Sequence, residues 1–216
     1  IRMAGAKPLS FAPGTEQKYS NTGYLMLAQI SEMVSGQGFE EQIRENFISK
    51  LGMESLVVGR DQTVVPRLAC GYSISDDSGL ILPIMMGIGM AKGAGSLVAS
   101  AGDVVRLVNL YRMLENNFLD TRPLAPLKLA NGTIAQATSK IGHGECTQSY
   151  LAGGTLLIFN DPEITLVGQV GSFPGFGTVF FYDRETMFAV VVSVNNEKCA
   201  NRAMNVAAQI LYELRD

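Results

Sequence analysis

Tyr19, Ser20 and Asn21 are the residues whose types and spacing best suit chemistry. Side chains two positions apart in an extended segment point the same way, so Tyr19 and Asn21 would face a common site. A phenol can take a proton from a serine when a nearby cation lowers its pKa, and an Asn amide can donate to a substrate carbonyl while accepting from a lysine. The structural alternative is an Asn in a turn that caps the following helix.

The context of this tripeptide distinguishes the two interpretations. Residues 11–56 run from FAPGTEQKYSN through Gly-Tyr and two helical patterns to Leu-Gly-Met. This run resembles the region around the second active-site motif of serine β-lactamases and penicillin-binding proteins, a family that includes class C β-lactamases, D-Ala-D-Ala carboxypeptidases and esterases. Residues 93–103 and 174–195 resemble, in the same order, the glycine-rich turn and the penultimate strand pair of that family.

The resemblance implies a serine hydrolase that acts through an acyl-enzyme on an amide or ester bond, such as a β-lactam, a D-amino-acid peptide or a small ester. Family members combine a Ser-x-x-Lys motif, a Tyr-x-Asn motif and a Lys- or His-x-Gly motif on a strand. Tyr19 would then be the general base or a proton relay. Asn21 would orient the substrate carbonyl and the lysine. No cofactor and no metal are expected.

The first motif is missing, because no Ser in the chain has Lys three positions later. In the family it precedes Tyr-x-Asn, so we expect it upstream of Ile1, or on a second chain. This polypeptide would be the C-terminal portion of an enzyme and inactive alone. Without the upstream part, apolar surfaces of the first helix, the last helix and the sheet would be uncovered, which requires a partner.

The third motif departs from the family pattern. Aligning Pro174 places Gln169, Val170 and Gly171 where Lys or His, a variable residue and Gly are usual. Gln169 cannot supply a positive charge, although its amide can hydrogen-bond a carbonyl or a phenol. Gly171 would let substrate lie against the strand, and the Ser172 N–H would be an oxyanion donor. The loss of charge disfavours substrates with a carboxylate and affects amidase or esterase activity less.

A different class of function is also open. The absent Ser-x-x-Lys and the neutral Gln169 suit a non-catalytic relative that serves as a binding or assembly module. His143 resembles a non-catalytic loop position of the family, and the three cysteines are not at metal-ligand spacing. A net charge of −3 disfavours nucleic acid as a partner, and apolar runs are too short to span a membrane. Family resemblance alone suggests a periplasmic or secreted protein.

The pattern of apolar residues predicts an α+β fold, with an antiparallel sheet flanked by helices and a mostly helical lobe. Residues 1–152 would form the helical lobe with the Tyr-x-Asn motif, and residues 153–216 the strands and last helix of the other lobe. The apolar stripe from Thr22 is broad enough for a helix buried on most sides. The other expected elements are helices at 39–50, from Asp103 and at 198–214, and strands at 155–159, 165–170, 177–182 and 188–194.

Overall fold

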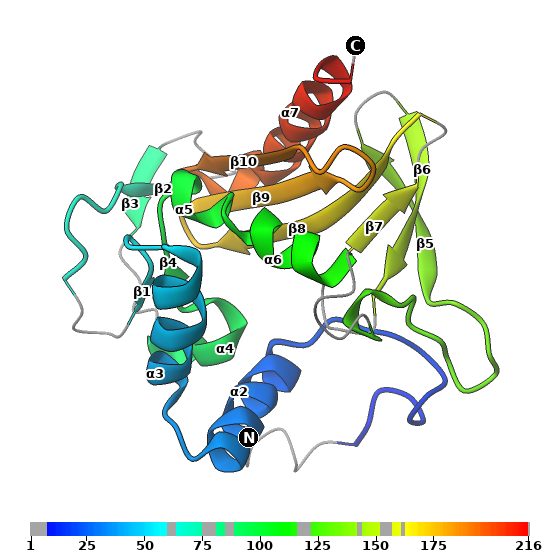
Figure 1. Cartoon of the computed structure of the whole chain (residues 1–216), viewed down its shortest axis with the longest axis horizontal. Coiled ribbons are helices and arrows are strands. Elements are labelled where there is room, and N and C mark those ends of the chain that lie inside the picture. The colour runs from blue at the N-terminus through cyan, green and yellow to red at the C-terminus, as the bar shows by residue number, and fades with distance from the viewer. Residues whose placement is uncertain are drawn as a thin grey trace.

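A six-stranded antiparallel sheet is the centre of the computed structural model (Figure 1). The structure describes residues 8–59, 64–74, 81–84, 89–115, 122–141, 144–151, 157–160 and 163–215. In spatial order the strands are β10 (Ala189–Val194), β9 (Phe176–Asp183), β8 (Thr165–Phe173), β7 (Leu157–Asn160), β6 (Gly144–Tyr150) and β5 (Gln136–Ile141). The expected α+β class with an antiparallel meander is confirmed.

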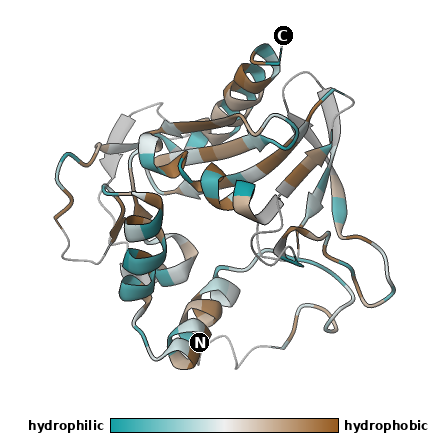
Figure 2. Ribbon diagram, viewed as in Figure 1, coloured by the Kyte–Doolittle hydropathy of each residue, from teal (hydrophilic) through white to brown (hydrophobic). Residues whose placement is uncertain are grey.

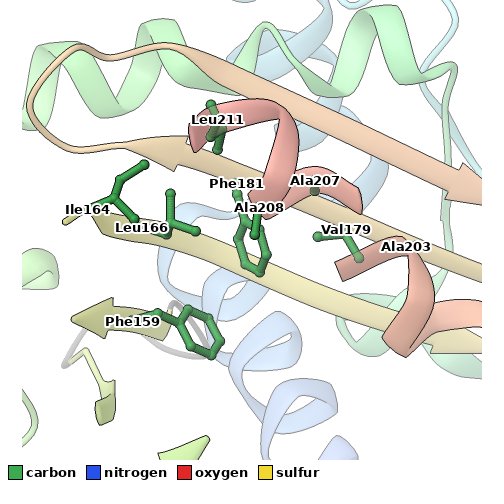
Figure 3. Packing of buried hydrophobic residues seen from close by; sticks show 9 residues of the cluster. All are labelled: Phe159, Ile164, Leu166, Val179, Phe181, Ala203, Ala207, Ala208 and Leu211. Carbon is green, nitrogen blue, oxygen red and sulfur yellow. The ribbon is translucent and has the colours of Figure 1, made fainter. Parts of the chain in front are cut away.

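Helices cover both faces of this sheet because alternate residues of its central strands point to opposite sides. Phe181 and Val179 face α7 (Ala200–Glu213), whose small residues Ala203 and Ala207 let the helix approach closely (Figure 3). On the opposite face, the buried residues Phe180 and Tyr182 pack against partly buried residues of α5 (Ala101–Val104) and α6 (Leu107–Glu115). This two-sided packing fixes β8 and β9 in the middle of the molecule.

Two helical segments lie near the N-terminus, close to where the apolar spacing predicts them. Helix α2 (Asn21–Ser35) ends at Gly36, whose positive φ of 72° lets its N–H bond the Glu32 carbonyl. Helix α3 (Phe39–Ile43) continues as a π-helical segment, η1 (Arg44–Ser49). In Figure 1 these helices lie beneath the sheet, and the N-terminal end of α2 is turned toward it.

Short elements connect the helices to the sheet. Strands β1 (Val57–Val58) and β4 (Leu97–Val98) pair with each other, as do β2 (Gly71–Ile74) and β3 (Ile81–Ile84). The 3-10 turn η2 (Gly89–Ala91) leads into α4 (Lys92–Gly95), and η3 (Arg122–Leu124) precedes β5. A last 3-10 turn, η4 (Glu197–Cys199), precedes α7.

Two features differ from the sequence-based expectation. The sheet begins at Gln136, earlier in the chain than expected. Strands β5 and β6 were not predicted, because their sequences mix polar and apolar residues without alternation. The helix expected from Asp103 is divided into α5 and α6, and Ser100 is its N-cap, since the Ser100 hydroxyl accepts from the Asp103 N–H. The division into two lobes at residue 152 stays a prediction. His143 lies outside the described residues.

The first helix is not buried on most sides, contrary to the interpretation of its broad apolar stripe. Ala28 is the buried residue of α2, whereas Met33 and Val34 are 77% and 83% exposed. Figure 2 shows hydrophobic stretches on this helix as well as on the central strands. Helix α7 also carries exposed apolar residues, Val206 and Ile210, and its C-cap residue Leu214 is exposed as well. The described residues of this chain therefore leave apolar helix surface in contact with solvent.

Candidate active site

Tyr19 and Asn21 are brought together at the N-terminal end of α2. The Tyr19 hydroxyl donates a hydrogen bond of 2.7 Å to Oδ1 of Asn21. The Tyr19 side chain is 51% exposed, so the pair lies at the surface of the chain. With Oδ1 engaged by the phenol, the Nδ2 group of Asn21 is the part that can donate to a carbonyl.

Ser20, between them, makes this arrangement possible. It is the N-cap of α2, with extended backbone angles (φ −146°, ψ 112°), and its hydroxyl accepts from the Gly23 N–H at 3.2 Å. Asn21 is the first helical residue and is not the cap, so the structural alternative for this Asn is wrong. Ser20, the middle residue of the motif, caps the helix. The side chains of Tyr19 and Asn21 can therefore form a hydrogen bond with each other.

The electrostatic surroundings keep Tyr19 protonated. Partial burial raises the pKa of the Tyr19 phenol, and the neighbouring Tyr24 phenol raises that pKa further. The two rings lie 5.6 Å apart, measured between centroids, and are tilted by 34°. A phenol in this state is a hydrogen-bond donor at neutral pH, and a cation close to it would be needed before it could accept a proton.

The third predicted motif lies on the second half of β8. Gln169 is half-buried, and its Oε1 accepts from the Val170 N–H at 2.8 Å. Gly171 and Ser172 are exposed and pair with Thr178 and Gly177 of β9. Within the described residues β7 pairs with β8 only as far as Gly168, so residues 169–173 are paired along one edge.

Gly171 has no packing reason to be glycine among the described residues. A β-carbon at this position would meet only the Thr178 carbonyl oxygen, at an ordinary contact distance of 3.8 Å. By contrast, a β-carbon at Gly168 on the same strand would lie 1.9 Å from the Phe180 carbonyl oxygen. The two glycines of β8 therefore differ: the sheet requires Gly168, whereas no described residue crowds the position of a β-carbon at Gly171.

Helix α4 connects the two halves of the candidate site. Gly93 packs against α2, since a β-carbon there would lie 2.7 Å from Cβ of Ala28. At the other end of α4, a β-carbon on Gly95 would lie 3.9 Å from Cδ2 of Phe173, the last residue of β8. An ion pair of 2.6 Å between Lys92 and Glu32 also joins α4 to α2. Sequence analysis singled out the two glycines by resemblance. It did not predict that they place α4 between α2 and the end of β8.

The described residues contain no group of three His, Cys, Asp or Glu side chains placed to hold a metal ion. No helix within the same described ranges has the length and apolarity required to cross a membrane. The polar groups of the candidate site are thus a phenol, two carboxamides, two serine hydroxyls and backbone N–H groups. Such groups donate and accept hydrogen bonds, and the two serines among them, Ser20 and Ser172, are not followed three positions later by Lys.

The fold and these motif positions define a chain of the β-lactamase class. The Beta-lactamase family model matches residues 1–212, and the chain belongs to this family. A β-lactamase of Pseudomonas fluorescens is 24% identical over 211 residues, covering 86% of this chain and 56% of that protein. A D-aminopeptidase of Gluconobacter oxydans (strain 621H) is 29% identical over 101 residues, which are 47% of this chain and 19% of that enzyme.

A solved structure supports the same fold. The D-amino acid amidase from Ochrobactrum anthropi SV3, complexed with L-phenylalanine amide, superimposes with a TM-score of 0.74 at 22% identity. The match covers 100% of this chain and 63% of the amidase chain. The named relatives are hydrolases. This chain spans 56% of the length of the Pseudomonas fluorescens β-lactamase and 19% of the length of the Gluconobacter oxydans D-aminopeptidase.

Proposed function

We propose that this chain is the C-terminal portion of a serine hydrolase that opens amide or ester bonds through an acyl-enzyme. The observation that carries the proposal is the 2.7 Å hydrogen bond between Tyr19 and Asn21 at the end of α2. It supports the catalytic interpretation because the pair is exposed and converges, while the cap of the helix is supplied separately by Ser20.

Tyr19 would relay the proton between the attacking serine and the leaving group. Its raised pKa sets a condition for this role, because a protonated phenol cannot act as a base. The lysine of an upstream Ser-x-x-Lys motif would meet the condition by placing a positive charge beside the phenol. Asn21 would hold the substrate carbonyl through Nδ2 and help to orient that lysine.

The β8 strand would hold the other side of the substrate. The open surface at Gly171 suits a molecule lying against the strand, and the Ser172 N–H would donate to the oxyanion. A neutral carboxamide at Gln169 stabilises an amide or ester group better than a free carboxylate, which favours a cation. We therefore favour amides and esters without a carboxylate at this position as the substrate class.

The partner in this proposal is a segment that carries Ser-x-x-Lys and covers α2. The exposed apolar side chains of α2 support it, since contiguous patches of this kind usually mark an interaction site. The alternative function is a non-catalytic β-lactamase-like binding or assembly module, which the neutral Gln169 favours. The two functions differ in one respect that can be measured, namely covalent labelling of a serine.

The test is labelling of the natural polypeptide that includes the residues upstream of Ile1. A fluorophosphonate and a fluorescent penicillin should each attach to a serine followed three positions later by Lys, as located by peptide mass spectrometry. Tyr19→Phe should slow labelling by ~100-fold or more, since positioned proton transfer contributes that much. Tyr212→Phe, on α7, removes a phenol hydroxyl away from the site and should label at close to the wild-type rate. Absence of labelling in the wild type would favour the module.

A further inference from the structure

Residues 70–74, which we name the strap, cross the end of the candidate site strand and are tied to the far side of the sheet. The Asn195 side chain donates to the Cys70 carbonyl at 3.1 Å, and the Tyr72 N–H donates to the Asn195 carbonyl at 3.0 Å. Lys198 donates to the Ile74 carbonyl at 2.6 Å. These bonds attach the strap along its length to the segment that follows β10.

Gly71 of the strap is pressed against the turn that joins β8 to β9. A β-carbon on Gly71 would lie 2.6 Å from Cε2 of Phe176 and 3.0 Å from the Gly175 carbonyl oxygen. A β-carbon on Gly175 would lie 2.9 Å from Cα of Gly71, so the two backbones meet without intervening side chains. Separations below 3.0 Å leave no room for even a methyl group at either position.

Near the start of this turn, a β-carbon on Gly95 of α4 would lie 3.9 Å from Cδ2 of Phe173, the last residue of β8. Phe173 pairs with Phe176, and Ser172 pairs with Gly177, so a displacement of the turn is transmitted directly to Ser172.

We infer that Gly71 and Asn195 are positioning residues for the Gln169–Ser172 strand, acting through the strap and the β8–β9 turn. This inference rests on the proposed function, in which the Ser172 N–H donates to the oxyanion. A donor of this kind stabilises the transition state more than the bound substrate, so its misplacement lowers kcat more than it raises KM. The strap would set the rate of the reaction without touching the substrate.

The experiment compares Gly71→Ala with Gly102→Ala in the natural polypeptide that includes this chain. Among the residues that the structure describes, a β-carbon at Gly102 would meet only the Ser100 hydroxyl oxygen, at 3.9 Å, so this control adds a methyl group without a clash. Gly71→Ala should lower kcat by ~10- to 100-fold with KM changed by less than ~3-fold, as for a small misplacement of a catalytic group. Adding Phe176→Leu removes the nearest clashing atom and should restore part of kcat.

Amide hydrogen exchange provides a readout that does not depend on activity. Exchange in residues 169–176 should accelerate in Gly71→Ala and in Asn195→Asp, which replaces the donor to Cys70 with an acceptor. Exchange in residues 163–168 should stay as in the wild type. Asn195→Asp adds no bulk and serves if Gly71→Ala does not fold.

Unchanged exchange in residues 169–176, or equal acceleration across the whole sheet, would overturn the inference. A wild type that forms no acyl-enzyme overturns the proposed function alone, because the exchange comparison still decides the role of the strap.

Discussion

Gly93 of α4 lies so close to Tyr24 of α2 that a β-carbon at residue 93 would be 2.8 Å from the Tyr24 carbonyl oxygen. The same β-carbon would be 2.7 Å from Cβ of Ala28, the buried residue of α2. Backbone and a short side chain cannot rotate away, so both helices must shift to admit a methyl group. The contact fixes the separation of α2, which carries Asn21, from α4.

Gly93→Ala should therefore destabilise the fold by ~1–3 kcal/mol, the usual cost of overpacking a close contact. The measurement is urea denaturation followed by circular dichroism, with a lower midpoint and an unchanged slope. Gly102→Ala is the matched control, since its β-carbon has an open position, and its midpoint should not fall. Equal midpoints for Gly93→Ala and the wild type would show that α4 does not pack tightly on α2.

Asp103 should make the stability depend on pH in the acid range. The Ser55 hydroxyl lowers the pKa of Asp103 most, the Ser55 N–H and the charge of Arg106 lower it further, and burial opposes them. The Ser55 N–H lies 2.6 Å from Oδ2, and Nε of Arg106 lies 3.4 Å from Oδ1. A carboxyl whose pKa is lower in the folded state stabilises the fold above its unfolded pKa of about 4, and this stabilisation is lost as pH falls through the folded pKa.

Asp103→Asn should lower the Tm at pH 7 and flatten the fall in Tm below about pH 4, where the wild type loses this contribution. The measurement is a series of thermal melts from pH 7 to pH 3. Glu213→Gln, at the exposed end of α7, removes one negative charge elsewhere and controls for net charge. Parallel Tm curves for Asp103→Asn and the wild type would contradict the assignment.

Among the polar residues of the sheet, Asp183 is predicted to cause the largest loss of folding stability when it is replaced. Its carboxylate is buried and accepts from the Glu185 N–H at 3.1 Å and from the Thr186 hydroxyl at 2.7 Å. Nε of Arg215, after α7, lies 3.5 Å from Oδ2. Asp183→Ala leaves these donors without their acceptor and should cost ~3 kcal/mol, whereas Thr186→Val should cost ~1 kcal/mol. Guanidinium denaturation of both variants checks the order, and a larger loss for Thr186→Val would contradict it.

Sequence patterns predicted the parts of this fold in which local chemistry and packing agree. Gly36 ends α2 with a positive φ, and the turn at Asp183 separates two β-branched, apolar strands, so these boundaries followed from residue type. Strands β5 and β6 were missed because Thr147 and Gln148 give no apolar alternation, and their pairing with each other and with β7 forms them. The α2 stripe was interpreted correctly as apolar and wrongly as buried, since burial depends on what packs against it.

The candidate site was predictable as residue types but not as geometry. Resemblance pointed to Tyr19 and Asn21 as candidates, and only the structure shows that Ser20 caps α2 while Tyr19 and Asn21 are hydrogen-bonded to each other. Partial burial raises the pKa of Tyr19, and so does the Tyr24 phenol, five residues further along the chain, whose ring lies 5.6 Å from that of Tyr19. The contact between Gly71 and Phe176 joins residues far apart in sequence, and no local pattern indicates such a contact.

Gln169 gives the most direct prediction about substrate choice. On β8 it precedes the open surface at Gly171 by two positions, so both residues face the same side of the strand. A lysine at residue 169 would add a positive charge there, and hydrogen bonds to charged groups contribute about 1.5–3 kcal/mol.

In the natural polypeptide that includes this chain, Gln169→Lys should raise kcat/KM for a substrate with a free carboxylate by ~10-fold or more relative to the matching carboxamide. Gln169→Met has a similar length and no charge, so it separates the effect of charge from that of shape. The measured quantity is the ratio of kcat/KM for the two substrates, and the same ratio in the Lys and Met variants would mean that residue 169 does not face the substrate.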